Sequence, residues 1–433
     1  MQQSTTYQYL IWLALPSIFS ALFNNLYRLI DQYFVQWLSA EAQAALGAST
    51  FILISGYALF TLVSAGVAPF IARYTGSKEE QKVHRVIKTG CILMLMAGLL
   101  FSLILSFGAP YLTESVGLQG KSAQELNTYL FWLGIAGTSI AFGPLLDAIW
   151  IARGDTQTPM KLQLLSTALN IILNWIFIFA LNLGIMGAAL ASGISRWVVV
   201  CIGFFILHKE FPLSYHQLFP FKKILKMGFP VAMGTILYSG VYWMLMYICI
   251  SPLGDSVHVA LGLGFSVLEG VSYPLYSGVM MAVSSIIGRQ LGSGNHIALD
   301  ATIKKGAVLS FSLGTMAMLV FLFAGQEICS QFTQSEDALE QAVLYAQILA
   351  FSQIFVAMEA MSEGVLSGSG DNKRLFWLSA PFNLLRVPLA YGMCFGLGMH
   401  AAGIWWAINI STYIKCCIKC HAVYKGKWRT ITL

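Results

Sequence analysis

Twelve long apolar runs, separated by short polar segments, make up almost the whole chain. They cover residues 9–34, 42–72, 85–109, 124–152, 160–182, 186–208, 222–250, 257–288, 302–325, 338–367, 374–397 and 400–420. A helix needs about 20 residues to cross the hydrocarbon core of a bilayer, and every run has that length. The pattern therefore predicts an all-α integral membrane protein with twelve transmembrane helices.

The composition supports a membrane protein rather than a soluble one. Of the 433 residues, 57% are hydrophobic and 10% are charged, whereas about 25% of the residues of a soluble domain are charged. The first run is longer than the apolar part of a cleaved secretory signal and follows a segment without lysine or arginine, so we expect it to remain as helix one. The eight cysteines are scattered and indicate buried thiols rather than a disulfide framework.

The net charge of +6 is a topology signal. Basic residues concentrate in every second loop and in the C-terminal tail, to which we assign Lys415 and Lys419. The basic segments are 73–88, 153–161, 209–226, 289–305, 373–374 and 415–429. Positively charged loops of membrane proteins face the cytoplasm. We therefore expect both termini on the cytoplasmic side of the cell (inner) membrane, and no nucleic acid as a partner.

The two halves of the chain repeat each other at a fixed offset of 216 residues. Arg73-Tyr74-Thr75-Gly76-Ser77 corresponds to Arg289-Gln290-Leu291-Gly292-Ser293, and Gly154-Asp155 corresponds to Gly370-Asp371. Each copy holds six helices, and because six is even, both copies enter the membrane from the same side. Transporters are often built from such parallel repeats.

The duplication predicts three parts of the chain. They are an N-lobe over residues 1–208, a cytoplasmic linker over residues 209–221 and a C-lobe over residues 222–433. Transporters of this construction bind substrate near the midplane of the membrane, where the repeats meet. We therefore expect a substrate site between the lobes.

Several motifs, taken in order, resemble those of a known transporter family. They are Leu15-Pro16 and Phe229-Pro230 at the openings of helices one and seven, Asp31 late in helix one, Gly154-Asp155-Thr156-Gln157-Thr158-Pro159-Met160 before helix five, Leu169-Asn170 and Leu173-Asn174-Trp175 within helix five, Gly187-Ala188-Ala189-Leu190-Ala191-Ser192 in helix six, and Gly288-Arg289-Gln290-Leu291-Gly292-Ser293-Gly294 after helix eight. Over nearly the whole chain they resemble the multidrug and toxic compound extrusion (MATE) transporters, whose superfamily also holds lipid-linked oligosaccharide flippases. The resemblance implies a V-shaped pair of six-helix lobes that exports organic cations or other amphipathic compounds in exchange for H⁺ or Na⁺.

Asp31 is the first candidate for ion coupling. An ionised carboxylate inside a membrane costs about 2.5–3.5 kcal/mol or more, so it needs a function or a partner. Asn170 and Asn174 are four residues apart and face one direction on helix five, and Ser192 lies on helix six. Converging oxygens beside a carboxylate can hold a proton or a hard cation such as Na⁺. The resemblance implies that these four residues form the cation site of the N-lobe.

Alternatives stay open at this site. The second carboxylate of the family's site is an asparagine here, Asn174, which weakens the case for Na⁺. Hydrogen bonding between helices, without any ion, would also account for Asn170, Asn174 and Ser192. Arg28 precedes Asp31 by three residues, within reach of an ion pair that would keep the carboxylate ionised and tune it away from proton exchange.

The other intramembrane acids are candidates for substrate or proton binding. Asp147 and Glu363 are equivalent positions of the repeat, and Glu359 lies one turn before Glu363. The resemblance implies that Glu359 is the acid that the family carries in helix ten. Two carboxyls one turn apart repel each other in a low dielectric, so we expect at least one of them to be protonated. Glu269 adds an acid in helix eight, and Tyr238 stands where many relatives carry a glutamate in helix seven. Each acid could instead be a buried structural carboxyl.

We predict a secondary active antiporter that takes a small-molecule substrate, acts as a monomer and needs no cofactor beyond its coupling ion. The sequence contains no phosphate-binding loop for ATP and no zinc-spaced cluster of histidine and cysteine. Cys417-Ile418-Lys419-Cys420-His421 has the spacing of a c-type haem attachment, but its predicted cytoplasmic location argues against haem. We expect no enzyme and no metal centre, with Na⁺ at Asp31 as one of the two choices of coupling ion.

Two other functions are weighed against antiport of cations. A flippase for a lipid-linked precursor would favour a cationic cavity that holds a phosphate, and Arg28, Arg196 and Arg386 are the only bases that we place inside the membrane. Five intramembrane acids against three arginines favour a cationic cargo. An intramembrane enzyme that uses the paired carboxylates of Glu359 and Glu363 would give no reason for a full-length duplication.

Overall fold

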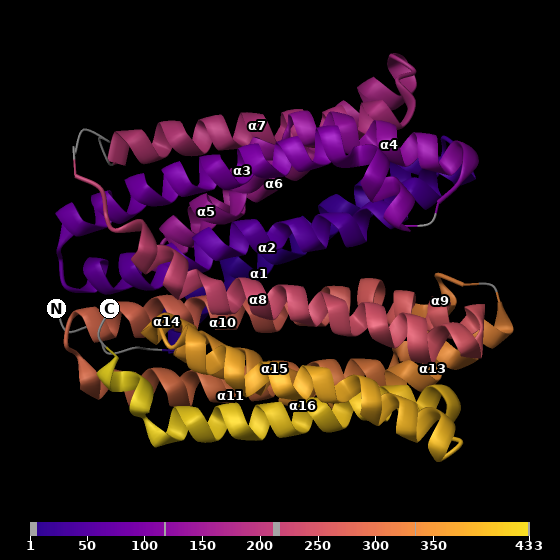
Figure 1. Ribbon diagram of the computed structural model, residues 1–433. Helices are drawn as coiled ribbons and strands as arrows, with labels where there is room; N and C mark the ends of the chain where they lie inside the picture. Colours follow the sequence, from indigo (N-terminus) through magenta and orange to yellow (C-terminus); the bar gives the residue numbers. More distant parts are fainter. Residues whose placement is uncertain (1–6, 117, 211–216, 334, 432–433) are drawn as a thin grey trace. The chain divides into compact units, whose positions relative to one another are not determined.

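The computed structural model describes residues 7–116, 118–210, 217–333 and 335–431, and all regular structure within these residues is helical (Figure 1). Helices are the expected form, because a lipid environment leaves no water to satisfy backbone groups and a helix satisfies them internally. The first half of the chain contains α1 (Tyr7–Val35), α2 (Ala40–Gly76), α3 (Glu80–Val116), α4 (Gly120–Ile135), α5 (Gly137–Arg153), α6 (Gln157–Asn174), the π-helical turn η1 (Trp175–Ala180) and α7 (Gly184–Glu210).

The second half contains nine further α-helices and several short helical turns. They are α8 (Phe221–Leu245), η2 (Met246–Ile250), η3 (Ser251–Leu253), α9 (Asp255–Leu263), η4 (Gly264–Leu268), α10 (Glu269–Gly292), α11 (His296–Phe323), α12 (Gly325–Ser330), α13 (Glu336–Ala350), α14 (Gln353–Ser369), α15 (Asn372–Tyr391), η5 (Gly392–Gly396), α16 (His400–Lys425) and η6 (Lys427–Thr430).

Eight helical segments in the described part of the chain are long and apolar enough to cross a membrane. Two further spans are bent pairs, α4 with α5 at 58° and α13 with α14 at 56°. The two remaining long segments are α15 with η5 and α16, which carry more polar residues. Together these segments correspond one to one to the twelve apolar runs, so the prediction of an all-α membrane protein is confirmed.

The duplication is visible in irregular features as well as in sequence. The break between α4 and α5 falls at Ala136, and the break between α13 and α14 falls at Phe351 and Ser352. Gly154 caps the end of α5 with φ +91°, and Gly370 caps the end of α14 with φ +87°. Only glycine adopts this left-handed backbone at little cost, so the same residue type closes the equivalent helix in both copies.

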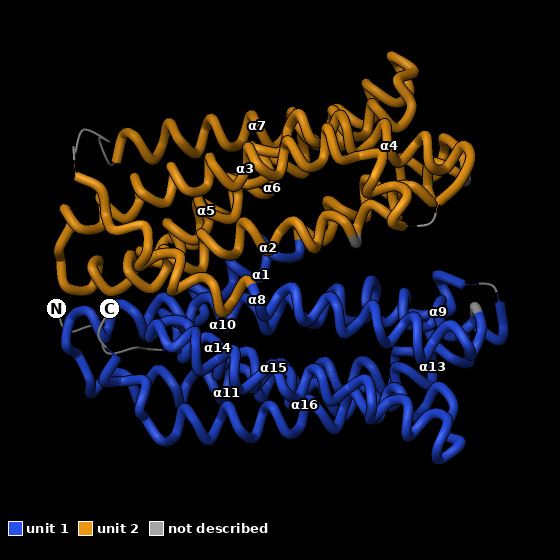
Figure 2. Tube along the Cα trace, in the orientation of Figure 1, with its two compact units in different colours: residues 1–22, 233–433 blue, residues 23–232 orange. Residues whose placement is uncertain are grey.

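The chain forms two compact units, which Figure 2 colours separately. Unit 1 contains residues 1–22 and 233–433, and unit 2 contains residues 23–232. Each unit therefore includes the first part of the opening helix of the other sequence half. In unit 1 the Cα of Gly278 on α10 packs against Ile18 of α1, because a Cβ there would lie 2.3 Å from the Ile18 side chain. The predicted lobes, residues 1–208 and 222–433, follow the sequence duplication and remain a prediction. The compact units differ from them, because the contact between Ile18 and Gly278 joins residues of both predicted lobes.

Small residues let helices approach closely inside each unit. A Cβ on Gly364 of α14 would lie 2.5 Å from the carbonyl oxygen of Met280 on α10, and one on Gly368 would lie 2.3 Å from that of Ser284. In unit 2 a Cβ on Gly228 of α8 would lie 1.8 Å from the carbonyl oxygen of Leu62 on α2. Close packing is one of the forces that drive helix association in membranes, and it also places polar side chains of neighbouring helices within bonding distance.

Candidate functional site

The structure brings together the four residues predicted for ion coupling. Asp31 lies near the end of α1, Asn170 and Asn174 lie in the last two turns of α6, and Ser192 lies on α7. The amide nitrogens of Asn170 and Asn174 donate to Asp31 Oδ1 at 3.0 and 2.8 Å, and the hydroxyl of Ser192 donates to Asp31 Oδ2 at 2.9 Å. All four side chains are buried in unit 2.

Asp31 is bound by neutral donors alone. No ion pair involving Asp31 occurs within the described residues, so three hydrogen bonds stabilise the negative charge without cancelling it. The amide of Asn174 also donates to Asn170 Oδ1 at 3.1 Å, and the buried Asn174 Oδ1 has no hydrogen-bond partner among the residues described. An uncancelled carboxylate beside a free acceptor oxygen can take up a proton or a monovalent cation.

A second layer of polar groups supports this site, and we did not predict it from the sequence. The hydroxyl of Tyr27 lies 2.9 Å from Ser195 Oγ and donates to the carbonyl oxygen of Ser192 at 3.2 Å. The guanidinium carbon of Arg196 lies 4.7 Å from the centre of the Tyr27 ring. The available signal was spacing: Tyr27 precedes Asp31 by four residues, and Ser195 and Arg196 follow Ser192 by three and four, so all of them share a helix face with the site.

Arg28 does not pair with Asp31. It is exposed, and its Nη2 donates to Asn25 Oδ1 at 3.2 Å. The spacing of three residues allowed an ion pair, but Asp31 faces α6 and α7 while the guanidinium of Arg28 is directed back along α1. Arg28 therefore leaves the carboxylate available, and a tuning role for it stays a prediction.

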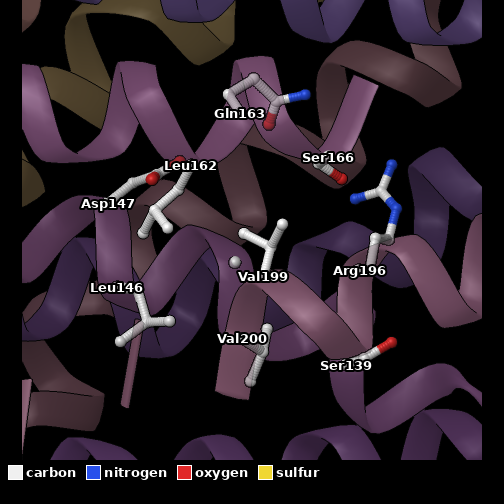
Figure 3. Close-up of a pocket in the computed structure, with 10 residues that line it drawn as sticks. Ser139, Leu146, Asp147, Leu162, Gln163, Ser166, Arg196, Val199 and Val200 are labelled. Atoms are coloured by element: carbon white, nitrogen blue, oxygen red, sulfur yellow. The ribbon is translucent and has the colours of Figure 1, made fainter. Parts of the chain in front are cut away.

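Asp147 lies apart from this quartet, at a cavity between α5, α6 and α7. The cavity has a volume of about 40 Å³ and is also lined by Gln163, Ser166 and Arg196. Figure 3 shows Asp147 and Arg196 well separated, with Leu162 and Val199 between them. A space of this size, with polar groups on part of its wall, can hold one or two water molecules. Because Arg196 also lies over the Tyr27 ring, it reaches from the cavity to the second layer of the Asp31 site.

The structure pairs Glu359 and Glu363 with lysines that we had assigned to the cytoplasmic tail. Lys419 Nζ lies 2.6 Å from Glu359 Oε1 and 2.5 Å from Glu363 Oε1, and Lys415 Nζ lies 3.0 Å from Glu359 Oε1. Both lysines belong to α16 and are buried. The assignment of Lys415 and Lys419 to the tail is therefore wrong, and these two lysines join the three arginines that we placed inside the membrane.

This pairing removes the expected repulsion between the two glutamates. The carboxylates of Glu359 and Glu363 lie one turn apart on α14 and share the ammonium of Lys419, so no proton is needed to relieve them. The sequence held a signal for this arrangement. Lys415 and Lys419 are spaced four apart, as are Glu359 and Glu363, which suits two facing helices with matched charges.

The two other candidates in unit 1 lie outside this cluster of charges. Glu269, at the start of α10, accepts a hydrogen bond from the hydroxyl of Tyr345 at 2.9 Å. Tyr238 of α8 packs against Tyr242 in a tilted arrangement with ring centres 4.8 Å apart, and it is 40% exposed. The structure thus separates the predicted acids of unit 1 into a lysine-paired group and a tyrosine-bound glutamate.

Two duplicated groups of membrane-spanning helices, each with buried polar sites between helices, define a membrane transporter rather than an enzyme. The comparisons with known proteins identify its family. The family model described as MatE matches residues 16–176 and 230–392. Because the match covers most of the chain, this protein belongs to the MatE family, the multidrug and toxic compound extrusion transporters, as its motifs predicted. It is a multi-pass membrane protein of the multidrug-efflux type, and transporters of this family need no cofactor.

Individual relatives agree with this assignment. The chain is 24% identical over 431 residues to the "Probable multidrug resistance protein NorM" of Thermotoga maritima, a match that covers 97% of this chain and 92% of the relative. A solved structure described as the "Outward-facing conformation of a multidrug resistance MATE family transporter of the MOP superfamily" matches with a TM-score of 0.92 and 20% identity, over 98% of this chain and 97% of the other. A further one, from Pyrococcus furiosus, matches with a TM-score of 0.89 and 19% identity over 98% and 97%, and is described by the words "Reverse polarity of binding pocket suggests different function".

Proposed function

We propose that this protein is a secondary active antiporter in which Asp31 binds and releases the coupling ion. The observation that supports this is the buried Asp31 carboxylate, held by three neutral donors and by no base within the described residues. A charge in this setting is costly unless it is periodically neutralised. Ion binding would neutralise the site, and the difference in free energy would bias the transporter between its inward-open and outward-open states.

We infer that the coupling ion is H⁺ rather than Na⁺. Two amide nitrogens face the carboxylate, an arrangement that suits an anionic carboxylate ready to accept a proton. Sodium would need several oxygen ligands at once, so both amides would have to turn. The site has a single carboxylate, because Asn174 stands in place of a second one, and the smaller negative charge also favours H⁺ over Na⁺.

We propose that the cargo is an amphipathic compound and that the transporter does not select one sign of charge. The sequence favoured cations because it set five acids against three bases. Lys415 and Lys419 raise the bases to five (3 + 2), which equals the acids Asp31, Asp147, Glu269, Glu359 and Glu363. The balance of the charges that we place inside the membrane therefore no longer selects organic cations. We further propose that both termini are cytoplasmic and that the transporter acts as a monomer.

Asp31→Asn tests the coupling role. We expect the purified variant, reconstituted into vesicles, to bind ethidium as the wild type does but to lose at least 90% of the ethidium movement driven by an imposed pH gradient, because an amide cannot exchange a proton at neutral pH. Asp337→Asn, in an exposed position at the start of α13, is the matched control and should transport normally. Full gradient-driven transport by Asp31→Asn, with correct folding, would contradict the proposal. If the wild type transports ethidium only under a Na⁺ gradient and Asp31→Asn does not, Asp31 keeps its coupling role but the coupling ion is Na⁺ instead of H⁺.

A flippase for a lipid-linked precursor is the second candidate. The observation that favours it is the number of buried bases in unit 1, where Arg386, Lys415 and Lys419 are each less than 7% exposed. A flippase predicts translocation of a fluorescent lipid analogue in the same vesicles, without a requirement for Asp31. Lipid translocation in the absence of any drug movement would favour this candidate over the antiporter.

A further inference from the structure

Arg386 is a buried guanidinium whose direct hydrogen-bond partners are all neutral groups. It lies on α15 and is 3% exposed. Its Nε donates to Ser411 Oγ at 2.7 Å, its Nη1 to the hydroxyl of Tyr242 at 3.1 Å and its Nη2 to Thr412 Oγ1 at 3.1 Å. Among the residues described, no carboxylate lies within the 4.0 Å of an ion pair. A buried charge without an opposite charge is costly, so the site is incomplete as it stands.

The nearby acids of unit 1 are engaged elsewhere. Glu269 accepts the hydroxyl of Tyr345. Glu359 is paired with both Lys415 and Lys419, and Glu363 with Lys419. The lysines thus use the glutamates as partners, and Arg386 remains a buried cation to which unit 1 supplies no direct counter-charge among the described residues.

The duplication shows that this site is the opposite of the Asp31 site. Subtraction of the repeat offset places Arg386 at the position of Asn170 (386 − 216 = 170), a donor to Asp31. The opening helices are related by 214 residues, from Pro16 to Pro230, so the equivalent of Asp31 is Leu245 (31 + 214 = 245), which is fully buried. One copy therefore has a carboxylate among neutral donors, and the other has a guanidinium among neutral acceptors.

The surroundings of Arg386 fit an anionic group on an apolar body. Its guanidinium carbon lies 5.9 Å from the ring centre of Tyr238 and 5.6 Å from that of Tyr242. Tyr238 is 40% exposed, so the pair of aromatic rings beside Arg386 reaches the surface of the unit. One turn before Arg386 on the same helix, the buried Asn383 Oδ1 has no hydrogen-bond partner within the described part of the chain and could accept from a ligand N–H or O–H.

We propose that Arg386 binds an oxyanion, a carboxylate or a phosphate, on an aromatic or otherwise apolar substrate that packs against Tyr238 and Tyr242. A guanidinium can hold such a group with two parallel hydrogen bonds. The site deepens the proposed function, because it makes zwitterionic and anionic amphiphiles part of the cargo. Transport of these compounds rests on the antiporter proposal, whereas their binding at equilibrium does not.

Equilibrium binding of matched probes to the full-length transporter tests this site. The probes are the fluorescent carboxylate 1-pyrenebutyrate, its uncharged analogue 1-pyrenebutanol and the cation ethidium, measured in phosphatidylcholine nanodiscs. For Arg386→Gln we expect at least a tenfold loss of pyrenebutyrate affinity and less than a twofold change for the other two probes. Arg386→Lys keeps the charge but not the planar fork, and should lose about two- to fivefold. Lys373→Gln, which removes an exposed charge from the first turn of the same helix, should change nothing.

The outcomes distinguish a lipid phosphate from a soluble carboxylate as the ligand of Arg386. They also distinguish the Arg386 proposal from the proposal of ion coupling at Asp31. Displacement of pyrenebutyrate by phosphatidylglycerol in the nanodisc would assign the site to a lipid phosphate, and resistance to it would assign the site to a soluble carboxylate. Unchanged pyrenebutyrate binding by folded Arg386→Gln would overturn the proposal, as would an equal loss of all three probes by both Arg386 variants. The test measures binding at equilibrium and needs no ion gradient, so a failure of the ion-coupling proposal leaves it decided on its own.

Discussion

At the scale of single residues, partners decide what a charge inside the membrane can do. Asp31 has neutral donors alone among the described residues and can change its charge without breaking an ion pair. Glu359 has two lysines within 3.0 Å and would have to leave both to do so. The same kind of side chain therefore serves exchange in one setting and cohesion between α14 and α16 in the other.

Lys419→Met should destabilise the protein through loss of this cohesion. The variant leaves Glu363 without its lysine and Glu359 with one partner instead of two. We expect a cost of up to roughly 3 kcal/mol, because the partly buried charge of Glu363 remains uncompensated. The midpoint of thermal unfolding of the purified protein measures the effect. The double variant Glu363→Gln/Lys419→Met should recover part of the loss. Lys425→Met, an exposed lysine of the same helix, is the control, and an equal effect of both single variants would rule out a stabilising ion cluster.

At the scale of elements, close helix contacts depend on glycines at defined positions. α8 passes α2 so closely that a Cβ on Gly228 would lie 1.8 Å from the carbonyl oxygen of Leu62. Further along α8, Gly240 faces open space, and no neighbouring atom of the described residues lies within 4 Å of the position that a Cβ would occupy there. The same substitution at Gly228 and at Gly240 therefore distinguishes the effect of helix packing on stability from the effect of helix propensity.

Gly228→Ala should push α8 away from α2. We expect a loss of about 1–3 kcal/mol, typical of overpacked sites, and a parallel fall in transport. Gly240→Ala should be neutral or slightly stabilising, because alanine has the higher helix propensity and meets no neighbour. Thermal unfolding and vesicle transport of both variants provide the comparison. Equal stability of the two variants would show that the contact between α2 and α8 relaxes without cost.

At the scale of the whole molecule, loop charge and chain duplication predict the orientation in the membrane. The basic loops recur at equivalent positions of both repeats, and the acidic segment 326–340 falls between two basic ones. The membrane potential and anionic cytoplasmic lipids both favour basic loops inside. The predicted orientation, with both termini in the cytoplasm, therefore determines the direction of all twelve spans together.

Cysteine labelling tests this orientation. In a variant without the eight native cysteines, a membrane-impermeant maleimide should label Gln331→Cys in intact cells, because that position lies in the acidic segment. Gln81→Cys, in the first basic loop, should react only after the cells are lysed. Both side chains replaced are exposed, so accessibility does not differ for local reasons. The reverse pattern would invert the topology and place both termini outside.

The amino-acid sequence by itself determined the helical spans, the duplication, the family and the group around Asp31. Apolar length and spacing along one helix are local properties, and the cost of an unpartnered carboxylate in lipid marked Asp31 without any knowledge of its neighbours. Only the tertiary structure decided that Arg28 turns away from Asp31, that Tyr27 supports it, and that Lys415 and Lys419 neutralise the glutamates of α14. These facts depend on how each helix is rotated against the next, and the same sequence spacing is compatible with several rotations until packing selects one.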